Sequence, residues 1–259
     1  MIQINTILVN IYFGPIVNTA RAISLQFSSA FSSFTNNFIV AFRTPMIKSY
    51  AEESFLYLNN LFNLSNKFIY YSLLMIFLPL FFEMNTILFL WLKSSDPQTV
   101  LFCRLILIYA LIMSLNNPIS IIIQATGHVK EYHVAVEIFT LLCVPLTYIF
   151  FKLGYPAYYS YLIMIFTAIA SHIVRLISLK KYYNSFSYYE YIISFIFPAF
   201  IITLISSTAL FFVHISIINT SFRLIVVFLL SIICVTMLTL ILGLSKTEKK
   251  DIKNLIFSN

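Results

Sequence analysis

Charged residues are scarce in this chain of 259 residues. Asp, Glu, Lys and Arg together make up 10% of the sequence, whereas a soluble domain carries about a quarter. Hydrophobic residues make up 60% of it, in apolar stretches that repeatedly exceed the ~20 residues needed to cross hydrocarbon. These stretches are continuous rather than alternating, which argues against a transmembrane β-barrel. The sequence therefore predicts an all-α integral membrane protein.

Residue types that carry enzymatic chemistry are few and dispersed. The four glycines form no phosphate-binding loop. The three cysteines lie in separate apolar segments, which indicates neither a disulfide framework nor a metal site: Cys103, Cys143 and Cys234. The four histidines lack the spacing of metal ligands: His128, His133, His172 and His214. We therefore expect no enzyme activity, no cofactor and no metal.

The net charge of +7 is distributed unevenly between the loops. When successive spans are assigned to alternate sides, one side collects most of the cationic residues: Arg43, Lys48, Lys67, Lys130, Arg175, Lys180, Lys181, Lys246, Lys249, Lys250 and Lys253. The other side holds Lys93, Lys152 and Arg223. This positive-inside pattern predicts a cytoplasmic C-terminal tail. We attribute the basic excess to topology and to anionic membrane lipids, and we expect no nucleic-acid partner.

We predict about seven full transmembrane helices preceded by a partial one. Residues 2–13 are apolar but too few to cross a membrane, and they look like the last part of a helix whose beginning is absent. Gly14 and Pro15 separate this segment from the next helix. The predicted full spans are 15–42, 68–92, 100–125, 133–151, 158–179, 191–213 and 222–244.

Two interruptions of the apolar pattern stand out. Residues 43–67 form the longest polar connection, and apolar residues recur in it at helical spacing. This favours either a short amphipathic helix on the membrane surface or an ordinary helical connector. Asn117-Pro118 is expected to break a helix in mid-span, because proline lacks a backbone donor and frees carbonyls that the amides can bond. Two interpretations of this motif remain possible at this point: a local kink that serves helix packing, and a contact with a ligand.

The stretch from Pro15 to Ala51 is too polar to be surrounded by lipid. On a helical projection one face is polar, although Leu25 and Ile39 interrupt it: Asn18, Arg21, Ser24, Ser28, Ser32 and Thr35. The opposite face is apolar: Ile16, Ala20, Ile23, Phe27, Phe31, Phe34 and Phe38. Such a helix crosses a membrane only if its polar face meets other helices or a wet cavity. The charge of Arg21 favours the cavity.

Ionisable residues inside spans are candidates for function, because an arginine at the bilayer centre costs about 2.5–3.5 kcal/mol. Arg21 is the first candidate, with snorkelling to the outer interface as the alternative. Arg104 lies closer to a helix end, where snorkelling is expected. Others are interpreted as helix-end or interfacial residues: Glu137, His172 and Arg175.

Several motifs together resemble a known family. They are FGPIVNTARAISLQ (13–26), TPMIKSYA (44–51), LPLFFEMNTILFLWL (78–92), NNPISIIIQATGHVKEY (116–132) and FKLGYPA (151–157). The set resembles the C-terminal half of bacterial polysaccharide flippases of the O-antigen (Wzx) type, in the multidrug/oligosaccharidyl-lipid/polysaccharide exporter superfamily. Thr44-Pro45 stands where relatives often have Asn-Pro.

The resemblance implies an architecture and a division of the chain. The architecture is that of the C-terminal bundle of a V-shaped, two-bundle transporter. That bundle would occupy residues 1–182, with an incomplete first helix at 2–13. Two additional transmembrane helices would occupy 183–245, and a basic cytoplasmic tail would occupy 246–259.

The resemblance also implies a substrate. Such transporters move undecaprenyl-pyrophosphate-linked oligosaccharide across the bacterial inner membrane by alternating access. Arg21 would contact the pyrophosphate or an acidic sugar, a role that suits a guanidinium. Asn18, Ser28 and Asn117 would line the cavity, and Arg104 is a further candidate for substrate binding.

Other readings remain open at this point. A flippase needs both bundles, so we expect a companion, either the missing N-terminal half or another chain, and no translocation by this chain alone. A cation-coupled multidrug exporter of the same superfamily would need membrane-embedded carboxylates, for which Glu83 and Glu137 are available. A membrane polymerase or acyltransferase of the polysaccharide pathway would need a large outer loop or a catalytic cluster. A fragment without activity is the last alternative.

Overall fold

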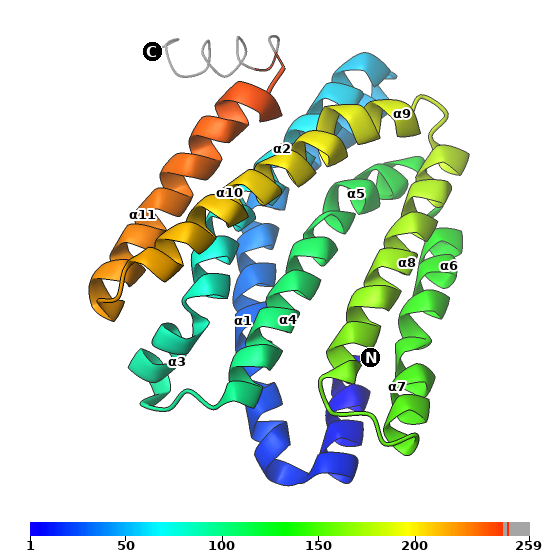
Figure 1. Ribbon diagram of the computed structural model, residues 1–259. Coiled ribbons are helices and arrows are strands. Elements are labelled where there is room, and N and C mark those ends of the chain that lie inside the picture. Colours follow the sequence, from blue (N-terminus) through cyan, green and yellow to red (C-terminus); the bar gives the residue numbers. More distant parts are fainter. Residues whose placement is uncertain (246–247, 249–259) are drawn as a thin grey trace.

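The computed structural model describes residues 1–245 and 248, and every regular element in that part of the chain is helical (Figure 1). Among the described residues, six helices are long and apolar enough to cross a membrane: Phe55–Phe82, Pro97–Thr126, Val129–Lys152, Tyr159–Tyr182, Tyr188–Ser216 and Thr220–Gly243. Each corresponds to one of the predicted spans. The predicted all-α membrane bundle is therefore confirmed. The predicted basic tail, 246–259, lies outside the described residues apart from Glu248.

Helix α1 (Ile2–Ala51) is a further long helix, and it is divided by a sharp turn at Gly14. The backbone of Gly14 has φ 79° and ψ −177°, a combination that is essentially restricted to glycine. Residues 2–13 therefore fold back beside the first turns of the segment 15–51, as Figure 1 shows in dark blue. We call residues 2–13 the N-terminal segment and residues 15–51 the long segment of α1.

The turn at Gly14 gives a first prediction. Gly14→Ala should lower the stability of the chain by about 1–3 kcal/mol, because an L residue is strained at this φ and ψ. The cause is backbone strain and not a clash, since nothing lies within 4 Å of a Cβ built there. Thermal unfolding of the purified chain in detergent measures the effect. Gly127→Ala is the control: Gly127 is an αL helix cap with an equally open surrounding, so its cost should be smaller.

The region 43–67 is mostly helical, as predicted, but it consists of the ends of two long helices and not of a separate surface helix or connector. The long segment of α1 continues through Pro45 to Ala51, and α2 (Phe55–Phe82) begins after a short turn. Met46 and Ser49, which follow Pro45 in the helix, are buried in the bundle, and their packing offsets the backbone hydrogen bond that a proline inside a helix lacks. Two asparagines of this region donate hydrogen bonds to backbone carbonyls. Asn59 donates to the carbonyl of Ser185 at 3.3 Å, and Asn66 donates to the carbonyl of Phe62 at 2.8 Å.

Most of the remaining spans are interrupted, and proline or glycine accompanies several of the breaks. The elements after α2 are α3 (Met84–Leu92), α4 (Pro97–Ser114), α5 (Asn116–Thr126), α6 (Val129–Leu141), α7 (Cys143–Lys152), α8 (Tyr159–Tyr182), α9 (Tyr188–Tyr191), the π-helix η1 (Ile192–Ile196), α10 (Phe197–Ser216), α11 (Thr220–Leu238) and the π-helix η2 (Thr239–Gly243). The break between α4 and α5 falls just before Pro118, as predicted. Another falls between α6 and α7, just before Pro145.

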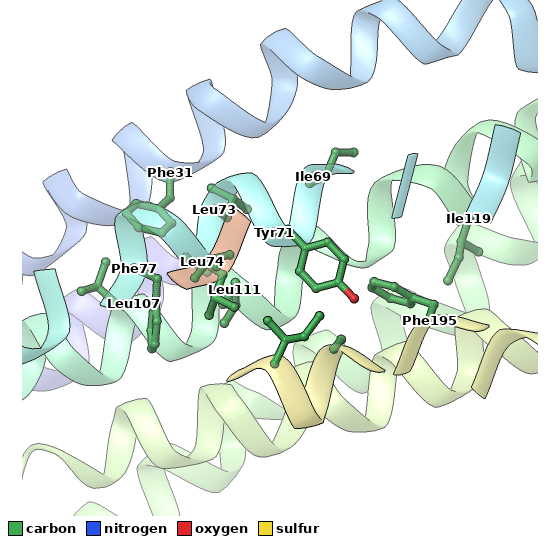
Figure 2. Packing of buried hydrophobic residues seen from close by; sticks show 14 of the residues in the cluster. Phe31, Ile69, Tyr71, Leu73, Leu74, Phe77, Leu107, Leu111, Ile119 and Phe195 are labelled. Carbon is green, nitrogen blue, oxygen red and sulfur yellow. The ribbon is translucent and has the colours of Figure 1, made fainter. Parts of the chain in front are cut away.

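Helix α2 is the central element of the bundle. Its buried residues meet Phe31 of α1, Leu107 and Leu111 of α4 and Phe195 of η1 in one apolar core (Figure 2). On its other side α2 packs against α10 and α11, which run as a pair along one edge of the molecule (Figure 1). Through α2, the two C-terminal helices are therefore joined to the rest of the bundle.

The bundle has two ends with different charge. The turns that follow α1, α5 and α8 gather at one end (Figure 1), and we call it the cationic end after its residues Arg43, Lys48, Lys130, Lys180 and Lys181. The turns at Gly14, after α3 and after α7 gather at the other end, which we call the Gly14 end. This arrangement of loops agrees with the alternation from which the cytoplasmic tail was predicted.

Candidate functional site

Arg21 lies inside the bundle at an exposed fraction of 0%. Its Nε donates to Oγ1 of Thr6 on the N-terminal segment at 3.1 Å, and Nη1 donates to Oγ of Ser160 on α8 at 3.4 Å. Its guanidinium carbon lies 5.1 Å from the centre of the Tyr161 ring. No carboxylate among the described residues forms an ion pair with it. Arg21 is thus a buried cation that is held by hydroxyl groups and an aromatic face.

A polar hollow of about 530 Å³ lies along the long segment of α1, beyond the start of the N-terminal segment. Its lining is rich in hydroxyl and amide groups: Ile2, Leu25, Ser28, Ser29, Ser32, Ser33, Asn36 and Asn37. Most of these polar residues are exposed, although they lie in the middle of the long segment of α1, between the two ends of the bundle. An amide or hydroxyl in hydrocarbon costs several kcal/mol when it has no partner. This face of α1 therefore requires water or another polar surface.

The predicted polar face of α1 is divided between two environments. Arg21, Ser24 and Thr35 are buried in the bundle, where Ser24 shares a hydrogen bond of 2.6 Å with the Tyr161 hydroxyl. Ser28 is nearly buried but lines the hollow, and Ser32 is exposed there. The face of the hollow continues to residues that the helical projection did not single out: Ser29, Ser33, Asn36 and Asn37.

A second polar cluster joins α5, α6 and α8. His172 Nδ1 lies 2.8 Å from Oδ1 of Asn116, and Arg175 donates to the hydroxyls of Ser120 and Tyr132. His172 Nε2 and Arg175 Nε are buried and have no hydrogen-bond partner among the described residues. We call these five residues the α8 cluster. The unpaired N–H at Nε of Arg175 makes it a second place where an acceptor group can bind, whereas Nε2 of His172 is itself an acceptor in the neutral ring, because Nδ1 donates to Asn116.

The two cationic groups lie at different heights along α8. Ser160, which bonds Arg21, is near the start of α8 at the Gly14 end, and Arg175 is near its other end. At a rise of about 1.5 Å per residue, Arg175 lies roughly 20 Å farther along the bundle than Ser160. Ser33 lies as many residues beyond Arg21 on α1 as His172 lies beyond Ser160 on α8. Because Arg21 contacts Ser160 and both helices run from the Gly14 end, His172 is at about the height of Ser33 in the hollow. Cationic and neutral polar groups thus succeed one another across the thickness of the bundle.

Arg104 does not join either group. Its Nε donates to the carbonyl of Phe81 at 2.9 Å, and its guanidinium carbon lies 5.6 Å from the centre of the Phe81 ring. Near it, the side chain of Glu83 is fully buried and accepts hydrogen bonds from Arg223. Arg104 and Glu83 therefore belong to the junction between α2, α4 and the C-terminal helices at the Gly14 end.

Of the predicted site residues, the structure places Asn18, Arg21 and Ser28 on one helix and separates Asn117 and Arg104 from them. Asn18 is half-buried, and its Oδ1 has no hydrogen-bond partner among the described residues. Asn117 is half-buried on α5, next to the asparagine that bonds His172.

Sequence reasoning missed the α8 cluster because it interpreted His172 and Arg175 as interfacial. A signal was present in the sequence. Ser160, Met164, Thr167, Ser171 and Arg175 recur at spacings of three and four residues, which places them on one face of α8.

No family model matches this chain, and no match to it was found among curated proteins or among solved structures. The resemblance to Wzx-type flippases therefore rests on the sequence motifs alone and stays a prediction.

Proposed function

We propose that this chain forms one wall of a transport passage for a lipid-linked oligosaccharide, as in polysaccharide and O-antigen flippases of the Wzx type. The observation that carries the proposal is the exposed hydroxyl and amide face of α1 in a helix that crosses the bundle. Hydrocarbon cannot solvate this face, so it meets a hydrated passage or a polar partner surface.

The chemistry of the hollow fits a sugar. Serine hydroxyls and asparagine amides donate and accept hydrogen bonds without a net charge, which matches the many hydroxyls of an oligosaccharide. The hollow is lined by no acidic residue among those described, so an anionic substrate meets no repulsion from these walls. Arg21 and Arg175 lie outside the lining of the hollow, and in this proposal they supply the positive charge that a pyrophosphate needs. The undecaprenyl chain of such a substrate would stay in the surrounding lipid.

The opposite wall of the passage comes from a companion in this proposal, either an N-terminal bundle or a separate chain. With one wall only, the polar face has no partner, so we expect no translocation by this chain alone. In this proposal the cationic end faces the cytoplasm, as the positive-inside rule favours, and the membrane is the bacterial inner membrane in which Wzx-type flippases act. Complementation of a flippase-null strain by this chain alone would contradict this arrangement.

A substitution in the hollow tests the function directly. Ser29→Leu combined with Ser33→Leu should reduce oligosaccharide export about tenfold or more, because it removes hydrogen-bonding groups from the wall and narrows the passage. Export is measured in a flippase-null strain that also produces a Wzx-type N-terminal bundle. The amount of protein in the membrane should not fall, since leucine is favourable in lipid.

The control is Thr208→Leu. Thr208 is exposed on α10, and its hydroxyl bonds only carbonyls of its own helix, at 2.9 and 3.0 Å. Export should be unchanged by this substitution. Equal export by the double leucine variant and the control would remove the hollow from the mechanism.

A further inference from the structure

An apolar crevice of about 180 Å³ lies between α2 and the end of α11, away from the hollow on α1. Its walls include Leu64, Phe68 and Met75 of α2, together with Leu240 of η2 and Leu244, which directly follows η2. An engineered apolar cavity of about 150 Å³ is large enough to bind benzene. The crevice can therefore hold a segment of hydrocarbon chain.

One wall of the crevice has an unusual local structure. Helix α11 is continued by the π-helix η2 (Thr239–Gly243), which faces α2 across the crevice. π-Helical turns are rare in proteins, and those that occur are often found at functional sites. Gly243 contacts the ring of Tyr71 so closely that a Cβ would lie 3.0 Å from Cε2 of that ring. The glycine thus lets α2 and η2 approach at one point, while the crevice remains beside it.

Two polar atoms inside the crevice have no partner among the described residues. The Tyr71 hydroxyl and Oγ1 of Thr239 are buried and form no hydrogen bond with any of them. Tyr71 is 2% exposed. A buried hydroxyl without a partner costs about 1–3 kcal/mol, so these two groups indicate a ligand with acceptor atoms.

Lys67 lines the crevice on the side that faces the cationic end of the bundle. The side chain of Lys67 is only 4% exposed, and its Nζ lies 2.9 and 2.8 Å from the two carboxylate oxygens of Glu248. The backbone amide of Ser245 donates to the same carboxylate at 2.6 Å. Burial raises the pKa of Glu248, but the bonds from Lys67 and Ser245 outweigh it and hold this pKa below its ordinary value. Glu248 therefore presents a charged carboxylate to Lys67.

Along α2 an ammonium group, a hydroxyl group and apolar side chains follow one another, in the same order as the phosphate, the ester groups and the acyl chains of a phospholipid. Lys67 lies where the apolar span of α11 and η2 ends, Tyr71 is one turn deeper, and Met75 is another turn deeper. A phosphate would therefore reach the ammonium, ester oxygens would reach the hydroxyls, and one acyl chain would lie between α2 and η2. Basic groups between helices at the cytoplasmic side are typical sites for anionic lipid headgroups.

We propose that this crevice binds one acyl chain of an anionic phospholipid of the surrounding leaflet, and that its phosphate replaces the Glu248 carboxylate on Lys67. The site lies outside the polar hollow, so the proposal does not rest on the proposed transport function. Glu248 acts as an internal competitor for the lipid phosphate. Binding of the lipid therefore breaks the ion pair between Lys67 and Glu248.

Native mass spectrometry of the full chain tests this, with dioleoyl phosphatidylglycerol and dioleoyl phosphatidylcholine supplied in equal amounts in detergent. The wild-type chain should retain phosphatidylglycerol in preference. Lys67→Gln should reduce its retention about fivefold, and Glu248→Gln should raise it by a similar factor. The opposite signs matter, because a pair with a purely structural role would give no gain from Glu248→Gln.

Three comparisons complete the experiment. Lys48→Gln is the control, because Lys48 pairs with Glu52 at the same end of the bundle but is exposed; it should leave retention unchanged. Ser72→Phe fills the crevice and should reduce retention of the lipid with Lys67 intact. Inorganic phosphate should not displace the lipid, because the acyl chain contributes to binding. No preference for phosphatidylglycerol, a loss with Glu248→Gln, or displacement by phosphate would each overturn the proposal.

Discussion

Replacing Arg21 with methionine is expected to stabilise the isolated chain while it strongly reduces transport. The expected gain is about 1–4 kcal/mol, the range found when buried ionic groups are replaced by apolar side chains of similar size. In a chain of this length each kcal/mol corresponds to about 2–4 °C in the unfolding midpoint. Thermal unfolding of purified wild-type and Arg21→Met chains in detergent measures the shift.

The gain follows from the surroundings of Arg21. It is fully buried, and its partners are hydroxyls, a thioether and an aromatic ring, without a carboxylate among the described residues. The hydroxyls of Thr6 and Ser160 donate to the backbone carbonyls of Ile2 and Ala157, so loss of the guanidinium leaves neither donor unpaired. The methionine fills much of the space and removes the cost of desolvating a charge. A lower midpoint would show that the bonds of Arg21 outweigh this cost.

Transport is expected to change in the opposite direction. In the presence of a companion bundle, Arg21→Met should reduce export about tenfold to a hundredfold, the worth of one hydrogen bond to a charged group. Arg21→Lys keeps the charge and should retain part of the activity. A stabilising substitution that removes function marks a residue retained for a ligand. Full export by the methionine variant would remove Arg21 from the site.

The helices of this protein could be predicted from the sequence, but several of their ends could not. Long apolar runs specify spans by length and composition alone, and the six spans agree with them. The connection predicted at 43–67 was too long, because Pro45 and a series of asparagines normally mark a break between two spans. In the structure Asn59 and Asn66 satisfy backbone carbonyls, and Met46 packs fully buried in the core. Tertiary packing here overrides local propensity, and no local pattern reports it.

The candidate site was predictable to the extent that it lies on one helix. The polar face of α1 follows from helical periodicity, which is enough to single out Arg21 and Ser28. Which part of that face is buried depends on the turn at Gly14, since the N-terminal segment brings Thr6 to Arg21. The α8 cluster depends on three helices that approach one another in space, so spacing within the sequence reveals only the face of α8 and not its partners.

Breaking the ion pair between Glu83 and Arg223 is expected to cause the largest loss of stability. Arg223 donates through Nε to one oxygen of Glu83 at 2.8 Å and through Nη2 to the other at 3.0 Å. Nδ1 of His214 lies 2.6 Å from the first oxygen, and Thr86 donates to the second at 3.0 Å. The carboxylate thus ties α10 and α11 to the junction of α2 and α3. Arg223→Met should lower the unfolding free energy by about 3–5 kcal/mol, because it leaves a buried carboxylate without its main partner.

The sign of this effect separates it from that at Arg21, although the substitution is the same. No carboxylate among the described residues pairs with Arg21, so its removal leaves no unpaired charge. Removal of Arg223, in contrast, takes the main partner from the buried carboxylate of Glu83. Adding Glu83→Leu to Arg223→Met should therefore recover most of the loss, since the unpaired charge disappears with it. Lys48→Met, at the exposed pair with Glu52, should cost no more than about 1 kcal/mol. If Arg223→Met is as mild as this control, Glu83 reaches water or another cation when Arg223 is gone, and the pair does not hold the C-terminal helices in place.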